Sequence, residues 1–147
     1  LLHVTHAKKI DLAFHLGDGL PAVEGDAGQI GQIVMNLILN AAEAIGDAPG
    51  VIDVATGVID IDGEVLAEYY GADALPPGRY VTLIVRDDGP GMSPEIAARI
   101  FEPFYTTKFT GRGLGMAVVL GIVRSHGGAI RVVSAPGRGA EVRIVLP

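Results

Sequence analysis

The sequence has 147 residues, enough for one domain whose folding buries about two-thirds of the chain's surface. Apolar residues make up 49%, which excludes a disordered tail, and the absence of Cys excludes disulfides, thiolate metal sites and thiol nucleophiles. The net charge of -6 argues against general nucleic-acid binding, and no apolar run approaches the roughly 18 residues of a membrane helix. The chain has no initiator Met and begins in mid-pattern, so we expect it to be part of a longer protein.

The N-terminal part predicts a strand followed by a long helix. Apolar residues alternate with other residues from Ile10 to Leu16, which predicts a half-buried strand. Asp26 is a suitable N-cap for a helix that runs to about Ile45 and is closed by Gly46.

The middle of the chain predicts two strands around an acidic stretch. The strands are expected at 51–59 and 80–86. Residues 60–75 contain no Lys or Arg, and we expect an exposed excursion there. It is either an inert hairpin or a docking edge, and the inert hairpin is favoured because acidic surfaces are usually only solvated.

The C-terminal part predicts two helices and a strand pair. Ser93 caps a short helix with Pro94 in its first turn, and a second helix runs from Gly113 to His126. The strands are expected at about 129–134 and 140–146. With no repeat and no linker, residues 1–147 are expected to form a single α/β domain, a mixed sheet covered by helices.

Charge divides the chain into two halves. Residues 1–78 carry two Lys against twelve Asp or Glu, a balance of -10, whereas residues 79–147 carry nine Lys or Arg against five Asp or Glu, a balance of +4. An anionic ligand is therefore expected to prefer the C-terminal half, although small domains often show such asymmetry by chance.

One stripe of the long helix is polar but uncharged over most of its length. Its members recur at steps of three and four residues: Gln29, Gln32, Asn36, Asn40, Glu43 and Asp47. An ordinary solvated face carries Lys and Glu, yet no charge occurs between Ala27 and Ala42. Two Asn one turn apart can present amide oxygens to a hard cation and amide donors to phosphate.

Three further segments are weak signals individually. Asp87-Asp88-Gly89-Pro90-Gly91-Met92 follows an apolar strand; it is either an ordinary turn or a site where Asp87 accepts from a ligand amine. The aromatic segment 101–108 is either a pinned loop or a lid in which Lys108 offers a charge to phosphate. Gly111-Arg112-Gly113-Leu114-Gly115-Met116 opens a helix and predicts an anion site, without the Walker A or Rossmann pattern.

In this order, NLILNAAEAI, VRDDGPGM, FEPFYTTK and GRGLGMAVVLGIV resemble the catalytic and ATP-binding domain of sensor histidine kinases. The wider family includes type II topoisomerases, heat-shock chaperones and mismatch-repair ATPases. The resemblance covers the chain from about Lys9 to Pro147. It implies the Bergerat ATP-binding fold, an α/β sandwich with a mixed sheet of about five strands covered on one face by about three helices.

The resemblance implies ATP and Mg²⁺ as ligands and assigns roles to matching positions. Asn40 would coordinate Mg²⁺, Asp87 would bind the adenine amine, and Asn36, Lys108 and Arg112 would serve the transfer of the phosphoryl group. The implied nucleotide-binding residues are Asn36, Asn40, Asp87, Gly89, Gly91, Met92, Tyr105, Thr106, Thr107, Lys108, Gly111, Arg112, Gly113, Leu114, Gly115 and Met116.

Several positions depart from the family pattern. Glu43 and Ala44 stand where many such kinases have Lys and Tyr, so Lys108 or Arg112 would have to supply that charge. Arg112 replaces a common Thr, and Ala140 replaces a Thr whose hydroxyl supports the adenine-binding Asp in many relatives.

The histidines of this sequence do not match the phosphoacceptor histidine that the resemblance implies as the substrate. His3, His6, His15 and His126 all lack the phosphoacceptor context, so we expect structural or surface roles, with His126 at a helix end where a cation suits the dipole.

The implied partner is the dimerisation and phosphoacceptor domain of the same kinase, and indirectly a response regulator. The isolated domain is expected to be a cytoplasmic monomer that does not autophosphorylate, without nucleic-acid or direct membrane contact; its parent is membrane-anchored or soluble. The alternatives are an ATPase or stand-alone serine kinase of the same fold, and a degenerate docking module that does not use nucleotide.

Overall fold

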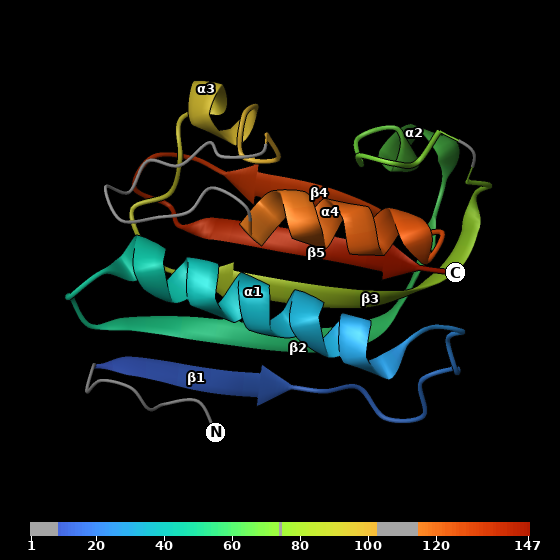
Figure 1. The fold of residues 1–147 in the computed structure, drawn as a ribbon, viewed down its shortest axis with the longest axis horizontal. Helices are drawn as coiled ribbons and strands as arrows, with labels where there is room; N and C mark the ends of the chain where they lie inside the picture. Colours follow the sequence, from blue (N-terminus) through green and yellow to red (C-terminus); the bar gives the residue numbers. More distant parts are fainter. Residues whose placement is uncertain (1–8, 74, 103–114) are drawn as a thin grey trace.

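A computed structural model describes residues 9–73, 75–102 and 115–147. Within them, five strands form one sheet in the order β1-β2-β3-β5-β4 (Figure 1). Strands β1 and β2 are parallel and the other neighbours are antiparallel, so the predicted mixed sheet is confirmed. The strands are β1 (Ile10–His15), β2 (Gly50–Ile61), β3 (Gly78–Asp87), β4 (Ala129–Ser134) and β5 (Ala140–Leu146).

Two helices, α1 (Ala27–Ile45) and α4 (Gly115–Ser125), cover one face of the sheet (Figure 1). The Asp26 carboxylate accepts a hydrogen bond from the Gln29 N–H at 3.1 Å, and Gly46 closes α1 at φ 73°, so both predicted ends are confirmed. The core between the helices and the sheet is aliphatic. Its least exposed side chains include Ile33, Leu37, Ile52, Val119, Val123, Ile130 and Ile144.

A short helix, α3 (Pro94–Ala97), follows β3. The Ser93 hydroxyl accepts from the Ile96 N–H at 3.3 Å, which confirms the predicted cap and the place of Pro94 in the first turn. Figure 1 places α3 at the β4 side of the sheet.

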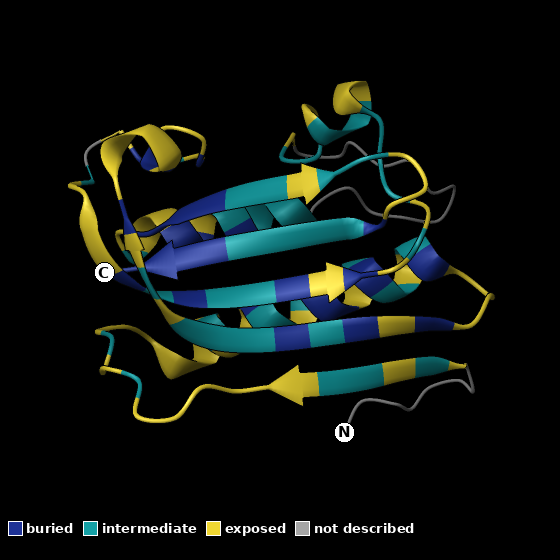
Figure 2. Cartoon of the chain, turned by 180° about the vertical axis from the view of Figure 1, so that it is seen from behind, coloured by how far each residue is buried: buried dark blue, intermediate teal, exposed yellow. Residues whose placement is uncertain are grey.

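The acidic stretch 60–75 is not the exposed hairpin that its charge suggested. Its first two residues belong to β2, and a helical turn, α2 (Gly63–Leu66), follows. Leu66, Tyr69 and Ala72 are buried, because they pack with Val145 and other strand residues in a second core. Val145 lies between Ile144 and Leu146 of the main core, and neighbouring strand residues face opposite ways, so this second core is on the other side of the sheet (Figure 2).

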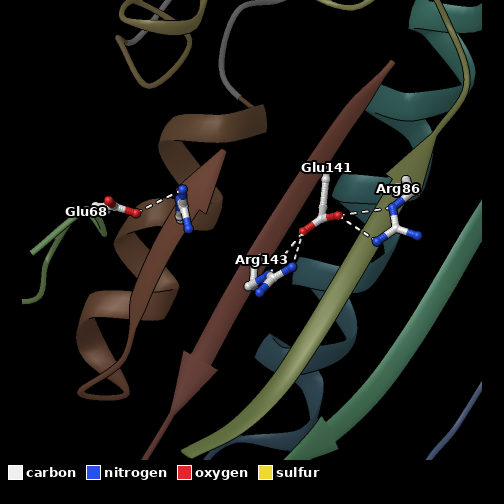
Figure 3. A network of polar contacts seen from close by, with 5 residues as sticks. Glu68, Arg86, Glu141 and Arg143 are labelled. Atoms are coloured by element: carbon white, nitrogen blue, oxygen red, sulfur yellow. Dashed lines mark hydrogen bonds and ion pairs between the residues drawn. The ribbon is translucent and has the colours of Figure 1, made fainter. Parts of the chain in front are cut away.

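The outer face also carries an ionic cluster that joins β3 to β5. Glu141 accepts from Arg86 at 2.7 Å and from Arg143 at 2.5 Å (Figure 3). Burial raises the pKa of the Glu141 carboxyl, but hydrogen bonds from the two arginines outweigh this effect and lower the pKa overall. The cluster therefore holds Arg86 and Glu141 in direct cross-strand register.

No helix in the described part of the chain combines the length and the apolar character that crossing a membrane requires.

Candidate functional site

Asp87 is a buried carboxyl group at the end of β3, with only 8% of its surface exposed. Burial raises the pKa of this carboxyl; backbone hydrogen bonds at Gly89 and Ala140 act against burial, and the Asp88 charge adds to it. The Gly89 N–H donates to Asp87 Oδ1 at 2.9 Å. Ala140 therefore supports Asp87 through its backbone. A buried carboxylate of this kind gains from any further donor that a ligand brings.

The loop after Asp87 is tightly packed around two glycines, and only Gly91 leaves no room for a side chain. Gly91 has φ +75°, and a Cβ built on it would lie 2.0 Å from the Ala135 carbonyl oxygen. A Cβ on Gly89 would lie 3.0 Å from Asp87 Oδ1 and 3.4 Å from Ile45 Cγ1. The loop backbone therefore passes between the end of α1 and the turn that joins β4 to β5.

Sequence reasoning missed the residues that hold this loop. The Ser134 hydroxyl accepts from the Met92 N–H at 2.9 Å and donates to the Gly139 carbonyl at 2.8 Å. The Gly137 N–H donates to the Pro90 carbonyl at 2.6 Å. The β4–β5 turn is thus one wall of the site rather than a plain connection. The sequence signal for this turn was its glycines. In the structure Gly139 has φ +72°, a conformation that favours glycine.

Asp88 has a different task from Asp87. Its Oδ1 accepts from the Val51 N–H at 2.9 Å, so it ties the loop to β2. The Asp88 carboxylate is therefore bonded to β2, whereas the Asp87 carboxylate lies at the candidate site.

Asn40 of α1 lies directly against the start of α4. A Cβ built on Gly115 would come within 3.2 Å of Asn40 Oδ1 and 3.3 Å of its Nδ2, so the glycine leaves the space that this amide occupies. Gly89 reaches the same helix one turn later, because its built Cβ would lie 3.5 Å from the Ala44 carbonyl carbon. Asn40, Gly115 at the start of α4 and the loop after Asp87 thus meet along one side of α1.

The amide side chains on this side of α1 suit the binding of a hard cation together with phosphate. Asn36 and Asn40 are both partly exposed and lie one turn apart on α1. Amide oxygens are acceptable ligands for Mg²⁺, which usually takes few protein ligands and keeps waters and phosphates. Among the described residues, no group of three or more His, Cys, Asp or Glu is placed to hold a metal.

The remaining predicted site residues divide into two groups. Met92 and Met116 are partly buried beside the loop and at the start of α4. Residues outside the described part of the chain are Tyr105, Thr106, Thr107, Lys108, Gly111, Arg112, Gly113 and Leu114.

The histidines outside the site are accounted for by contacts elsewhere. His126 Nε2 accepts from the Asp26 N–H at 3.0 Å, and its Nδ1 lies 2.8 Å from the Ile122 carbonyl. These contacts confirm the expected structural role. His15 pairs with Asp53 at 3.0 Å on the surface. His3 and His6 fall outside the described residues.

Comparisons with known proteins agree with the family resemblance of the sequence motifs. A family model for histidine kinase-, DNA gyrase B- and HSP90-like ATPases matches residues 25–147. The sensor histidine kinase ZraS of Escherichia coli is 37% identical over 143 residues, which are 97% of this chain and 27% of ZraS. The structure of a mycobacterial sensor histidine kinase, MprB, has a TM-score of 0.71 at 30% identity, over 95% of this chain and 82% of that chain. Full-length ShkA in complex with AMPPNP has a TM-score of 0.71 at 32% identity, over 94% of this chain and 25% of ShkA.

Proposed function

The chain belongs to the family of histidine kinase-, DNA gyrase B- and HSP90-like ATPases, and we propose that it is the ATP-binding catalytic domain of a sensor histidine kinase. It binds ATP with Mg²⁺ and presents the γ-phosphoryl group to a histidine on a separate dimerisation and phosphoacceptor domain, in two-component signalling. The observation that carries the proposal is the meeting of Asn40, Gly115 and the Asp87 loop along α1.

Asp87 recognises the adenine ring in this proposal. Its buried carboxylate accepts a hydrogen bond from the exocyclic amine, which offsets part of the cost of burial. Gly89 and Gly91 allow the backbone to approach the flat ring, and Met92 borders it.

The other end of the nucleotide lies toward Asn40. Asn40 holds Mg²⁺, and Asn36 helps to hold metal, water or phosphate. When bound, Mg²⁺ offsets part of the negative charge of the triphosphate. Lys108, Arg112 and the backbone N–H groups from Gly111 to Met116 are proposed to contact the β- and γ-phosphates.

Transfer to a histidine is favoured over hydrolysis by the identity of Asn36. Relatives that hydrolyse ATP have a Glu there to activate water, and an amide cannot accept that proton. A neutral imidazole nitrogen is already a nucleophile. The bond from the γ-phosphorus to the bridging oxygen breaks, a phosphorus–nitrogen bond forms, and ADP leaves with the bridging oxygen.

The partners and location are proposed on the same basis. The chain spans about a quarter of the length of ZraS, 27%. The proposed direct partner is the dimerisation and phosphoacceptor domain of the same kinase, and a response regulator is an indirect partner. The domain is proposed to be a monomer on the cytoplasmic side.

The test is a transfer assay with γ-labelled ATP, Mg²⁺ and the separately expressed phosphoacceptor hairpin of the parent kinase. We expect acid-labile label on the hairpin with the wild-type chain and its loss with Asn40→Ala. Gln32→Ala, on the same helix stripe, serves as the matched control and retains transfer. Rapid release of inorganic phosphate with no label on the hairpin would favour an ATPase instead.

A further inference from the structure

One side chain joins the end of α4 to the start of α1. His126 directly follows α4, and its Nε2 accepts a hydrogen bond at 3.0 Å from the N–H of Asp26, the cap of α1. Its Nδ1 lies 2.8 Å from the Ile122 carbonyl, so the ring is also anchored to its own helix. The two helices are therefore bonded to each other at this end.

The same ring fits tightly against the chain that leads into α1. A Cβ built on Gly25 would lie 2.5 Å from His126 Cδ2 and 2.9 Å from its Nε2, so a side chain at this position would push the ring away. The hydrogen bond and the close contact act at the same place. Together they determine how far the end of α4 lies along the start of α1.

The opposite ends of these two helices meet at the proposed metal ligand. The helices lie side by side and run in opposite directions (Figure 1). Gly115 is the first residue of α4, and a Cβ built on it would lie 3.2 Å from Asn40 Oδ1. At 1.5 Å per residue, this contact is about 17–21 Å along the helices from the His126 contact. The helix pair thus has one defined contact near each end.

The aliphatic core between the helices leaves a task for a directional contact. Leu37 of α1 and Val119 of α4 belong to the main core and hold both helices on the sheet. Burial of apolar surface is non-directional, whereas a hydrogen bond has a preferred distance and angle. A slide of α4 by a few tenths of an ångström would already change the space beside the Asn40 amide, because Gly115 lies so close to it. The register of the two helices therefore affects where the Asn40 amide can lie.

We propose that His126 is a positioning residue for the metal-binding end of the nucleotide site, because it fixes the register of α4 on α1 and so keeps Gly115 in place beside Asn40. The inference rests on the proposed function, in which Asn40 holds Mg²⁺. His126 itself lies at the far end of both helices and acts only through them. The net contribution of one hydrogen bond corresponds to roughly a two- to tenfold change in affinity.

The experiment compares His126→Ala, Gly25→Ala and His126→Gln in the 147-residue chain. NMR follows the side-chain amide signal of Asn40 in the nucleotide-free chain, and calorimetry measures the affinity for AMPPNP with and without Mg²⁺. We expect His126→Ala to move the Asn40 signal and to reduce the gain in affinity from Mg²⁺ by about two- to tenfold. Gly25→Ala displaces the ring without removing it and should change both values in the same direction. His126→Gln offers an amide oxygen near the place of Nε2 and should restore both values.

Tyr80→Phe is the matched control for a general loss of stability. It removes the hydrogen bond of 2.5 Å from the Tyr80 hydroxyl to the Pro76 carbonyl, and Tyr80 belongs to the second core, on the other side of the sheet. Its loss lowers stability by about as much as the loss of the His126 bond. We expect the Asn40 signal and the Mg²⁺ dependence of this variant to match those of wild type.

The outcomes separate the two proposals. Wild-type binding that Mg²⁺ strengthens, with an unmoved Asn40 signal and unchanged Mg²⁺ dependence in His126→Ala, overturns the role of His126 and leaves the proposed function standing. An equal effect of Tyr80→Phe, or no rescue by His126→Gln, also overturns this role, because a general loosening would then be the cause. If the wild-type chain does not bind the nucleotide, the proposed function fails, and this inference fails with it.

Discussion

Replacing Gly115 with Ala tests the site without threatening the fold. The new methyl would sit 3.2 Å from Asn40 Oδ1, tighter than an ordinary van der Waals contact, so the amide must move by a few tenths of an ångström. The substitution itself suits a helix, where Ala is favoured over Gly by about 0.5–1 kcal/mol. We therefore expect unchanged or slightly increased stability, with displacement of Asn40, the proposed metal ligand.

The affected quantity is the gain in nucleotide affinity that Mg²⁺ provides. We expect Gly115→Ala to reduce this gain by about tenfold, or about 1.4 kcal/mol, with a smaller change in metal-free binding. Gly121→Ala is the matched control, since it lies on the same helix with nothing within 4 Å of its built Cβ. It should raise stability by about 0.5–1 kcal/mol and leave affinity as it is.

Calorimetric titration of both variants with AMPPNP, with and without Mg²⁺, measures these effects, and urea unfolding measures stability. Equal Mg²⁺ dependence in Gly115→Ala and Gly121→Ala would refute the assignment of Asn40 as the metal ligand. Marked destabilisation of Gly115→Ala would show that the contact belongs to the core instead.

Three further predictions concern stability. Because burial raises the pKa of Asp87, its contribution is present below the unfolded-state pKa and is lost as pH rises through the folded pKa. Asp87→Asn should therefore gain thermal stability relative to wild type as the pH rises through that range, and a pH-independent gap would contradict this. His126→Ala removes the acceptor for the Asp26 N–H and should cost about 1 kcal/mol in urea unfolding, whereas exposed His15→Ala should cost close to nothing. Gly91→Ala should cost clearly more than the roughly 1–2 kcal/mol of a left-handed residue, because its methyl would also meet a carbonyl oxygen 2.0 Å away; equal costs for this variant and Gly137→Ala, which has open space, would oppose that reason.

Local signals explain what could be predicted of the fold. The Asp26 cap and the Gly46 stop define α1 within a few residues, and alternation gave the bounds of β4 and β5. The order of the four motifs indicated the family and its fold, and the assignment of the site residues stays a prediction.

Long-range contacts explain what could not be predicted. The acidic stretch buries Leu66 and Tyr69 against strands far away in sequence, and their local spacing of three residues does not indicate which strands they pack against. Ser134 likewise has no local signal, because its bond to Met92 spans 42 residues. The charged residues correctly indicated the exposed surface of these segments but gave no information about their buried residues.

The most direct measurement of the central claim is a calorimetric titration of the chain with AMPPNP and Mg²⁺, for wild type and Asp87→Asn. We predict micromolar binding by wild type, strengthened by Mg²⁺ and lost in Asp87→Asn, where an amide donor faces the adenine amine. Absence of binding by wild type, or equal binding by the variant, would contradict the proposed nucleotide site.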